Sequence, residues 1–231
     1  MADARGTYLS VVERVVDHND DTRSIFLRMR LEAAFKWTPG QFISMLIPLG
    51  DEIRRRAYSI ASLDDGLLEV CFNQVRGGRG VGWLFDRSPG DAVEFMGPFG
   101  NFTLEAPAQV ETIFIAEGTA IAPIRPMLHR TQSSSHAPMQ LLYAAVDRAH
   151  ILYGHELEEL AASAASFKFE TLIGDDIYSR LHDEVNRRWV EADSNRARQF
   201  YICGVGKDVT RIRDLLRGSG YERRAVHYEQ W

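Results

Sequence analysis

The chain has 231 residues, of which 45% are hydrophobic and 26% charged, and these ordinary values exclude a disordered chain or a fibre. The length exceeds the usual size of one domain and favours two. Lys and Arg number 27 against 32 Asp and Glu, a net charge of −5, so the chain has no general basic field to hold nucleic acid.

Short alternating or β-branched runs, separated by turn signals, fill the first part of the chain and favour a small antiparallel barrel. A single short helix is expected there, over Gly82–Asp86. We expect residues 1–104 to form one domain with this fold. The predicted strands are Tyr8–Val16, Thr22–Met29, Gln41–Ile47, Arg56–Ser62, Leu67–Val75 and Ala92–Met96.

After Gly97-Pro98-Phe99-Gly100, strand-like apolar runs alternate with amphipathic segments of helical length, and this alternation predicts a parallel α/β sheet. Residues 105–231 should form this second domain, with the boundary near Leu104–Pro107. The predicted strands are Val110–Ala116, Gln140–Ala145, Phe167–Leu172 and Phe200–Cys203, and the predicted helices are Pro123–Thr131, Glu156–Ala165, Ser179–Trp189 and Val209–Arg217.

Two motifs in the barrel half have the residue types of a binding site. In Arg56-Ala57-Tyr58-Ser59, strand spacing puts the guanidinium and the phenol ring on one face, where they suit a ligand with phosphate and aromatic parts. The alternative is an exposed basic strand with a core tyrosine. In the segment Arg76–Leu84, glycines expose backbone N–H groups where a short helix begins, which is typical of an anion site and also of a hairpin connection.

Two further motifs lie in the α/β half. The strand Thr112–Ala116 leads through a glycine turn at Glu117–Ala122 into a helix, and Tyr201–Lys207 repeats this order. Open α/β sheets bind nucleotides at the carboxyl ends of their strands. The two turns therefore predict the flanks of one nucleotide crevice.

The order of these motifs resembles that of the ferredoxin–NADP reductase superfamily of flavoproteins, and the likeness covers nearly the whole chain. The chain looks most like compact bacterial ferredoxin reductases and oxygenase reductase components without their ferredoxin domain. The motifs that carry the resemblance are Arg56-x-Tyr58-Ser59, a glycine-rich loop, Gly97-Pro98-Phe99-Gly100, Gly118-Thr119-x-Ile121-Ala122-Pro123, Cys203-Gly204 and a terminal aromatic residue.

The resemblance implies an FAD-binding barrel and an NAD(P)-binding α/β domain with a C-terminal tail that covers the flavin. The implied activity is electron exchange between NADP(H) or NAD(H) and a one-electron carrier, such as ferredoxin, flavodoxin or another small protein. Two cysteines are too few for an iron–sulfur cluster in the chain itself. The carrier is therefore expected to be a separate protein.

Site residues carry over by the same resemblance. Arg56 would bind the flavin phosphates, Tyr58 would lie beside the isoalloxazine, and Trp231 would cover it. The implied catalytic residues are Ser59, Cys203 and Glu229. The implied FAD-binding residues are Arg56, Ala57, Tyr58, Ser59, Gly78, Gly80, Val81, Gly82, Thr119 and Trp231, and the implied NAD(P)-binding residues are Gly118, Thr119, Arg148, Arg180, Cys203 and Gly204.

Several positions depart from the family pattern. Val81-Gly82 replaces a hydroxyl residue of the phosphate loop, and Ala120 replaces a glycine, so that its methyl group is expected to crowd the coenzyme turn. Asp208 stands where a methionine is usual, while Val146 and Asp175 stand where arginine or Ser-Arg is usual. The choice between NADPH and NADH therefore stays open.

Basic residues near the flavin motifs suggest a docking site for an acidic carrier. Other functions remain as alternatives: an oxygenase reductase component, a reductase of free flavins or quinones, or a flavin-binding electron-transfer or regulatory subunit with a decayed coenzyme site. Trp231 argues against free flavin as substrate, because it predicts a covered site. The basic residues are Arg54, Arg55, Arg76, Arg79, Arg223 and Arg224.

The sequence gives no sign of a metal centre or a membrane span. His150 and His155 have the wrong spacing for a metal pair on a helix, and the two cysteines, Cys71 and Cys203, cannot build a disulfide framework. No apolar core of a signal peptide and no membrane-length apolar run occurs. We expect a cytoplasmic protein.

Overall fold

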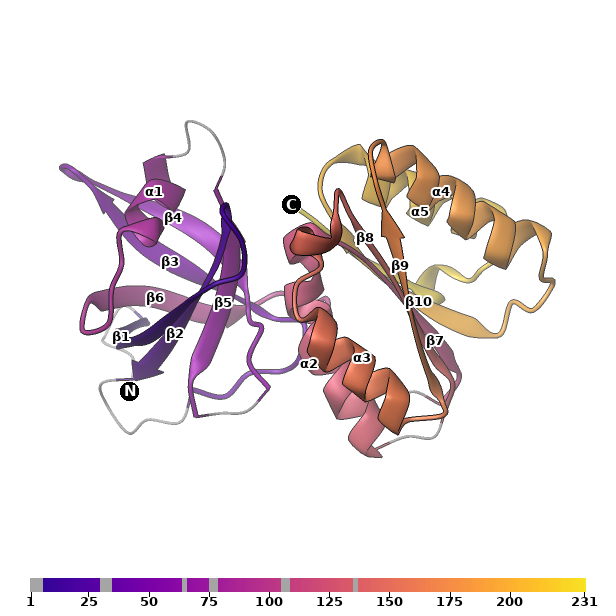
Figure 1. Ribbon diagram of the computed structural model, residues 1–231, viewed down its shortest axis with the longest axis horizontal. Helices are drawn as coiled ribbons and strands as arrows, with labels where there is room; N and C mark the ends of the chain where they lie inside the picture. Colours follow the sequence, from indigo (N-terminus) through magenta and orange to yellow (C-terminus); the bar gives the residue numbers. More distant parts are fainter. Residues whose placement is uncertain (1–5, 30–34, 64–65, 75–78, 105–108, 135–136) are drawn as a thin grey trace. The chain divides into compact units, whose positions relative to one another are not determined.

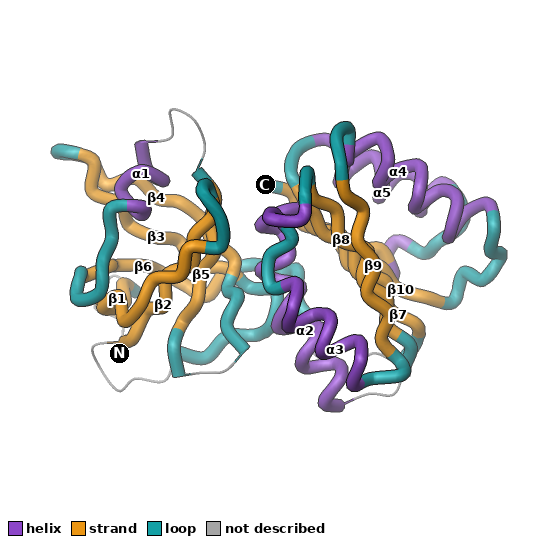
Figure 2. The backbone as a smooth tube through the Cα atoms, viewed as in Figure 1, coloured by secondary structure: helices purple, strands orange, loops and turns teal. Residues whose placement is uncertain are grey.

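The structure, a computed structural model, describes the chain apart from residues 1–5, 30–34, 64–65, 75–78, 105–108 and 135–136. The chain divides into two compact units, Met1–Glu105 with Arg125–Met127, and Ala106–Ile124 with Leu128–Trp231. The first contains an antiparallel sheet and the second a parallel sheet with helices, as Figure 2 shows. The fold class expected from the sequence is confirmed.

The first unit is a six-stranded antiparallel sheet in the order β4-β3-β6-β1-β2-β5. Alternation along β3 turns Ile43, Met45 and Ile47 inward, where each has no exposed surface. A bridge between Ile60 and Val70 links the two edges of the sheet, which curls it into a barrel. The elements are β1 (Thr7–Asp17), β2 (Thr22–Met29), β3 (Phe42–Leu49), β4 (Glu52–Ser59), β5 (Leu68–Asn73), α1 (Arg79–Phe85) and β6 (Ala92–Phe99).

Strand β4 begins earlier and ends earlier than the predicted Arg56–Ser62. It starts at Glu52 and pairs along its whole length with β3, so the three consecutive arginines lie within the strand. Periodicity misses this start because residues 52–57 are all exposed and show no apolar alternation. The hairpin to β3 and its backbone hydrogen bonds, rather than burial, define the strand.

The second unit is a five-stranded parallel sheet in the order β11-β10-β7-β8-β9. In Figure 1, α2 and α3 cover one face while α4 and α5 cover the other. The central strand β7 is therefore apolar throughout its interior, as sheets covered on both faces require. The strands are β7 (Glu111–Glu117), β8 (Met139–Ala145), β9 (Phe167–Ile173), β10 (Arg198–Gly204) and β11 (Val226–Gln230).

The helices of the second unit begin close to their predicted positions. Among the helices of the described residues, none combines the length and the apolar character needed to cross a membrane. The helical elements are η1 (Gly118–Ala120), α2 (Ile121–Ser134), η2 (Arg148–His150), α3 (Gly154–Ser163), α4 (Ile177–Asn186), η3 (Arg187–Glu191), α5 (Lys207–Gly218) and η4 (Arg223–Ala225).

The last strand, β11, is an element that the sequence analysis treats only as a tail. It pairs in parallel with β10, with Cys203 opposite Glu229 and Gly204 opposite Gln230. Its first residue, Val226, is buried, and the four that follow are in turn half-buried, exposed, half-buried and exposed. So short an edge strand with polar residues gives little periodic signal, and only pairing with β10 reveals it.

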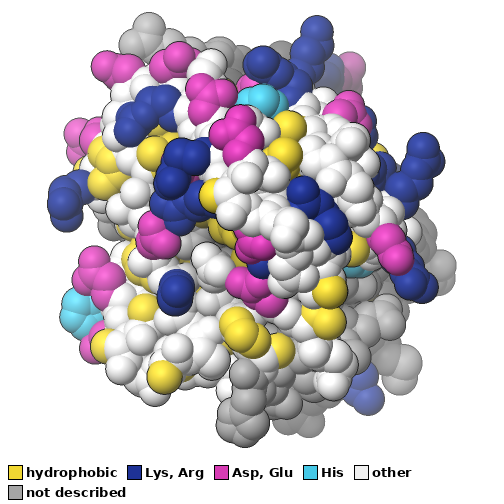
Figure 3. Space-filling view, turned by 90° about the vertical axis from the view of Figure 1, so that its right-hand side faces the viewer, with side chains coloured by type: hydrophobic (Ala, Val, Ile, Leu, Met, Phe, Trp, Pro, Cys, Tyr) yellow, Lys and Arg dark blue, Asp and Glu magenta, His cyan; other side chains and the backbone are white. Residues whose placement is uncertain are grey.

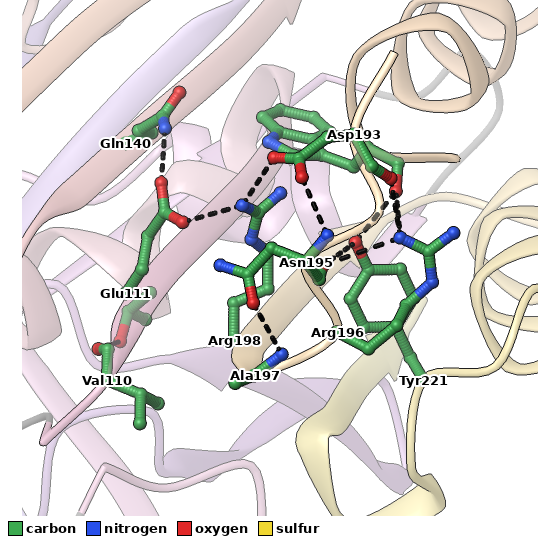
Figure 4. Close-up of polar contacts among 11 residues, drawn as sticks. Val110, Glu111, Gln140, Asp193, Asn195, Arg196, Ala197, Arg198 and Tyr221 are labelled. Carbon is green, nitrogen blue, oxygen red and sulfur yellow. Dashed lines mark hydrogen bonds and ion pairs between the residues drawn. The ribbon is translucent and has the colours of Figure 1, made fainter. Parts of the chain in front are cut away.

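A buried arginine network closes the opposite end of this sheet (Figure 4). Arg198, at the start of β10, has a side chain only 5% exposed and forms ion pairs with Glu111 at 2.9 Å and Asp193 at 2.6 Å. Gln140 of β8 donates a hydrogen bond of 2.7 Å to the same Glu111. These contacts tie β7, β8 and β10 together at their amino ends, so the charged cluster has a structural role there.

One glycine of the first unit sits where no other residue fits. Gly40 has φ +99°, and an added Cβ would lie 1.8 Å from the Phe102 carbonyl oxygen. We expect Gly40→Ala to lower the free energy of unfolding by about 3–4 kcal/mol, measured by urea denaturation, because strain and a backbone clash combine. Gly50 is the matched control: it has φ +68° with nothing within 4 Å of an added Cβ. Gly50→Ala should cost only about 1–2 kcal/mol, and equal losses would contradict the clash.

Candidate functional site

The candidate cofactor residues of the first unit lie on β4 and α1. Arg56 and Tyr58 pair with Met45 and Ile43 of β3, so both project on one face of the strand. The Arg56 stem runs along α1, where an added Cβ on Gly80 would lie 3.7 Å from the arginine Cγ. The arginine stem therefore lies against the first turn of α1.

Tyr58 sits next to aromatic core residues. Its ring meets Phe72 edge-on, with centroids 5.8 Å apart, and Phe72 in turn meets Phe85 at 5.3 Å. Burial raises the pKa of Tyr58 to about 12, so the phenol stays protonated and can donate a hydrogen bond. An added Cβ on Gly82 would meet nothing within 4 Å, so the α1 surface is open there. A guanidinium, a phenol and open glycine backbone together fit a ligand with phosphates and an aromatic ring, as FAD has.

The remaining predicted residues of this unit lie around the same strand and helix. Ala57 is exposed on β4, Ser59 is 6% exposed at the end of β4, and Val81 is half-buried on α1. Gly78 and Arg76 lie outside the described residues, as does the side chain of Arg79. Their roles stay predictions.

In the second unit, the coenzyme turn follows the central strand. Gly118 has φ +53° and open space where a Cβ would stand, and its carbonyl oxygen accepts a 2.8 Å hydrogen bond from the Tyr143 hydroxyl. Half-buried Thr119 follows it. Ala120, whose methyl group is expected to crowd the approach of the coenzyme, is only 3% exposed, and its effect on the coenzyme stays a prediction.

Cys203 and Glu229 meet at the carboxyl end of the sheet. They are opposite each other in the β10–β11 register, and Glu229 Oε2 is buried with no hydrogen-bond partner among the described residues. Burial raises the pKa of Glu229 to about 7. Burial, and then the Glu229 charge, raises the pKa of the Cys203 thiol, so this thiol is protonated and no nucleophile. The pair offers a proton-holding carboxyl group beside a neutral thiol.

Trp231 lies beside this pair. Its backbone N–H donates to the Gly204 carbonyl and its carbonyl accepts from the Gly206 N–H, both at 3.1 Å. Its side chain also hydrogen-bonds the Cys203 thiol, while the residue stays 40% exposed. The structure therefore brings together Cys203, Glu229 and Trp231, and a role for Trp231 as a flavin cover stays a prediction.

The two arginines proposed for the coenzyme also follow strand ends. Arg148 is exposed in η2, shortly after β8. Arg180 of α4 donates a 2.8 Å hydrogen bond to the Ile173 carbonyl, and its Nη1 lies 2.7 Å from where a Cβ on Gly174 would stand. Arg180 thus covers the turn after β9. Both arginines remain candidates for a phosphate of the coenzyme.

Two residues at this edge are missed by the sequence analysis. The Tyr178 hydroxyl, on α4, donates a hydrogen bond to the Glu117 carboxylate at the end of β7. Burial raises the pKa of Glu117, and the hydrogen bond from Tyr178 partly opposes that rise. An acidic residue directly before a glycine turn is the signal that was available for Glu117. No sequence signal points to Tyr178.

The comparisons with known proteins agree with this geometry. Residues 10–104 match the oxidoreductase FAD-binding domain family, and residues 114–211 match the oxidoreductase NAD-binding domain family. The chain is 32% identical over 212 residues to ferredoxin–NADP reductase B of Sorangium cellulosum, an alignment that covers 86% of each protein. The chain therefore belongs to the ferredoxin–NADP reductase superfamily. It is a flavoprotein oxidoreductase that uses FAD and a nicotinamide coenzyme, which confirms the sequence-based expectation.

Other similarities are more distant. The chain is 25% identical to the reductase component of propane 2-monooxygenase from Rhodococcus jostii, covering 95% of this chain but only 62% of that protein. A solved ferredoxin NADP+ reductase from Neisseria gonorrhoeae, with FAD and NADP bound, matches its fold with a TM-score of 0.82. That match has 18% identity and covers 97% of this chain and 98% of the other.

Glu229 should make stability depend on pH. Its pKa rises from an ordinary 4.5 to about 7 on folding, so the folded state binds the proton more tightly and stability falls as pH rises between these values. We expect a loss of roughly 2–3 kcal/mol across this window, measured by urea denaturation. Glu229→Gln should remove this loss and be the more stable form above about pH 7.

The exposed Glu158 of α3 supplies the matched control for this measurement. Glu158→Gln should keep the wild-type pH dependence, because it leaves the buried Glu229 carboxyl group in place. Parallel pH curves for wild type and Glu229→Gln would show that Glu229 is not the responsible group.

Proposed function

We propose that this protein transfers electrons between NAD(P)H and a one-electron protein carrier such as ferredoxin or flavodoxin. The observation that supports this most is Glu229 Oε2, which is buried beside Cys203 with no hydrogen-bond partner among the described residues, at the carboxyl edge of the sheet of a chain in the ferredoxin–NADP reductase superfamily. FAD, when bound, takes up electrons as a hydride pair and gives them out singly.

The first unit would hold the flavin. Arg56 would bind its phosphates, with the backbone of Gly78, Gly80, Val81 and Gly82 completing the site. Tyr58 would lie against the ring system and use its protonated hydroxyl as a donor. Ser59, at the end of the same strand, would contact the reacting edge of the flavin. These residues bind and orient, and none of them is required to form a covalent bond.

The second unit would position the coenzyme. The turn at Gly118 and Thr119 and the strand end at Cys203 and Gly204 would orient the nicotinamide, since hydride transfer depends mainly on holding two rings at near-attack distance. Glu229 would hold or release a proton at Oε2, for which a pKa of about 7 is well suited. Arg148 and Arg180 would serve the phosphates, and neither arginine decides between NADPH and NADH.

The proposed carrier docks on basic residues near the flavin motifs. Arg54 and Arg55 are exposed on β4, although Arg54 already pairs with Glu52 at 3.0 Å. On the face shown in Figure 3, by contrast, basic and acidic side chains are interspersed. Local positive charge would attract an acidic carrier despite the net charge of −5. We propose that the protein acts in the cytoplasm, where it would meet ferredoxins and flavodoxins.

A reductase component of an oxygenase is the second candidate function. The likeness to the propane 2-monooxygenase reductase component, over 95% of this chain, favours it. In that case the electron acceptor would be an oxygenase or its ferredoxin. The electron path from NAD(P)H would be the same, so only the acceptor separates the two functions.

Arg56→Ala should release FAD without unfolding the protein. The charge-assisted contact with phosphate contributes about 1.5–3 kcal/mol, so the FAD dissociation constant should rise roughly ten- to a hundredfold. Fluorescence titration of the apoprotein measures it. Arg55→Ala is the matched control, because Arg55 lies on the same strand but pairs with Leu46 on the other face. An FAD affinity of Arg56→Ala within twofold of wild type would reject the assignment.

Carrier reduction tests the proposed function directly. The FAD-loaded protein should reduce a ferredoxin or flavodoxin with NADPH or NADH under anaerobic conditions. Arg55→Glu should slow this reaction several-fold at low salt while leaving ferricyanide reduction unchanged, since small acceptors need no docking site. Arg28→Glu, on β2, is the control. Failure with every carrier while ferricyanide is reduced would favour a different acceptor, and equal loss with both acceptors would remove the docking site.

A further inference from the structure

Glu117 ends the central strand of the parallel sheet, and its carboxylate is fixed by groups from other elements. Tyr178, on α4, donates its hydroxyl to it. The backbone N–H of Val205, after β10, approaches Oε2 at 3.5 Å. The carboxylate is therefore held at one place at the carboxyl edge.

That place is next to Cys203. The β7–β10 register puts Ala116 opposite Cys203, so Glu117 falls beside Gly204. An added Cβ on Gly204 would lie 3.5 Å from Glu117 Oε2. Because β10 lies between β7 and β11, Ala116, Cys203 and Glu229 form one row across the three strand ends, and Glu117 lies in the next row, beside Gly204.

The carboxylate still has acceptor capacity. Two oxygens accept several hydrogen bonds, while here one hydroxyl and one long N–H contact reach them. The charged group that acts on the Glu117 carboxylate is Asp208 on α5, and its charge is also negative. None of these contacts of the Glu117 carboxylate is with a cation. Such a group favours a ligand that brings hydrogen-bond donors.

The nicotinamide coenzymes contain both kinds of chemistry. Their ribose hydroxyls and carboxamide N–H groups donate hydrogen bonds, whereas their phosphates only accept them and carry negative charge. A carboxylate beside Gly204 and directly before Gly118, two residues that the proposed function assigns to the coenzyme, would therefore attract the nicotinamide-riboside end and repel a phosphate. Its position makes it a contact of the same coenzyme site.

We propose that Glu117 is a coenzyme-binding residue, which accepts a hydrogen bond from a hydroxyl or amide group of the nicotinamide-riboside end. Tyr178 is its positioning residue, since it fixes the carboxylate without needing to touch the ligand. This inference rests on the proposed function, in which this edge binds NAD(P)H.

Calorimetric titration of the FAD-loaded protein tests the proposal without relying on turnover. The probes are NAD+, NADP+ and adenosine 5′-monophosphate, which lacks the nicotinamide riboside. Glu117→Ala should weaken NAD+ and NADP+ by about ten- to a hundredfold, the usual effect of losing a hydrogen bond to a charged group. It should leave adenosine 5′-monophosphate within twofold of wild type.

Three further variants keep the test decisive. Glu117→Gln retains the size and one acceptor oxygen, so it should fold like wild type and show a smaller loss for NAD+. Tyr178→Phe should weaken NAD+ several-fold, because the carboxylate remains but is less well fixed. Glu158→Gln, an exposed carboxylate on α3, should bind all probes like wild type.

The failures are distinguishable. Unchanged or tighter NAD+ binding in both Glu117 variants overturns the proposal, as does an equal loss for adenosine 5′-monophosphate, which would mean that Glu117 only shapes the edge. Loss of NAD+ and NADP+ binding already in the wild type would instead overturn the proposed function, and this inference with it.

Discussion

Parallel pairing of β10 with β7 on one side and β11 on the other is the constraint on which the coenzyme edge depends. The backbone ladder fixes the register, and the register alone decides that Cys203 lies opposite Glu229 and that Glu117 lies beside Gly204. Parallel strands all end at the same edge, so their last residues become neighbours without any side-chain contact having to assemble them. Burial at this edge raises the pKa of Glu229.

Burial and lack of partners work together at this edge. A buried oxygen such as Glu229 Oε2, which has no hydrogen-bond partner in the described part of the chain, costs free energy in the folded protein, and a fold can keep it only if other contacts compensate. The charged cluster at the start of β10 and the apolar core between the sheet and α4 and α5 are such contacts. Buried polar groups without hydrogen-bond partners, held in place by a stable surrounding structure, are typical of functional sites.

Much of the fold is predictable from the sequence because the buried elements have clear periods. Strands such as Thr22–Met29, which the prediction matches at both ends, have a buried apolar centre, and helices of the second unit such as α5 show apolar stripes. β4 and β11 differ, since one is exposed along most of its length and the other is a short edge strand. Their positions follow from pairing partners far away in sequence, which periodicity does not contain.

The candidate site divides in the same way. Arg56, Tyr58, Cys203 and Glu229 are found from ordered motifs and a family resemblance. Glu117 and Tyr178 are missed because they are 61 positions apart in the chain and join only through a hydrogen bond between two elements of the fold. When the role of a residue depends on a partner that is distant in sequence, the local sequence around it gives no signal of that role.

Because of the charged cluster around Arg198, the two ends of the parallel sheet differ in how well they tolerate substitutions. At the amino ends, an ion pair and a hydrogen bond join three strands, so a substitution there disturbs several elements at once. At the carboxyl ends, residues such as Val146 and Val205 are exposed and take no part in such a network. New coenzyme or acceptor preferences can therefore evolve at one end of the sheet while the other preserves its architecture.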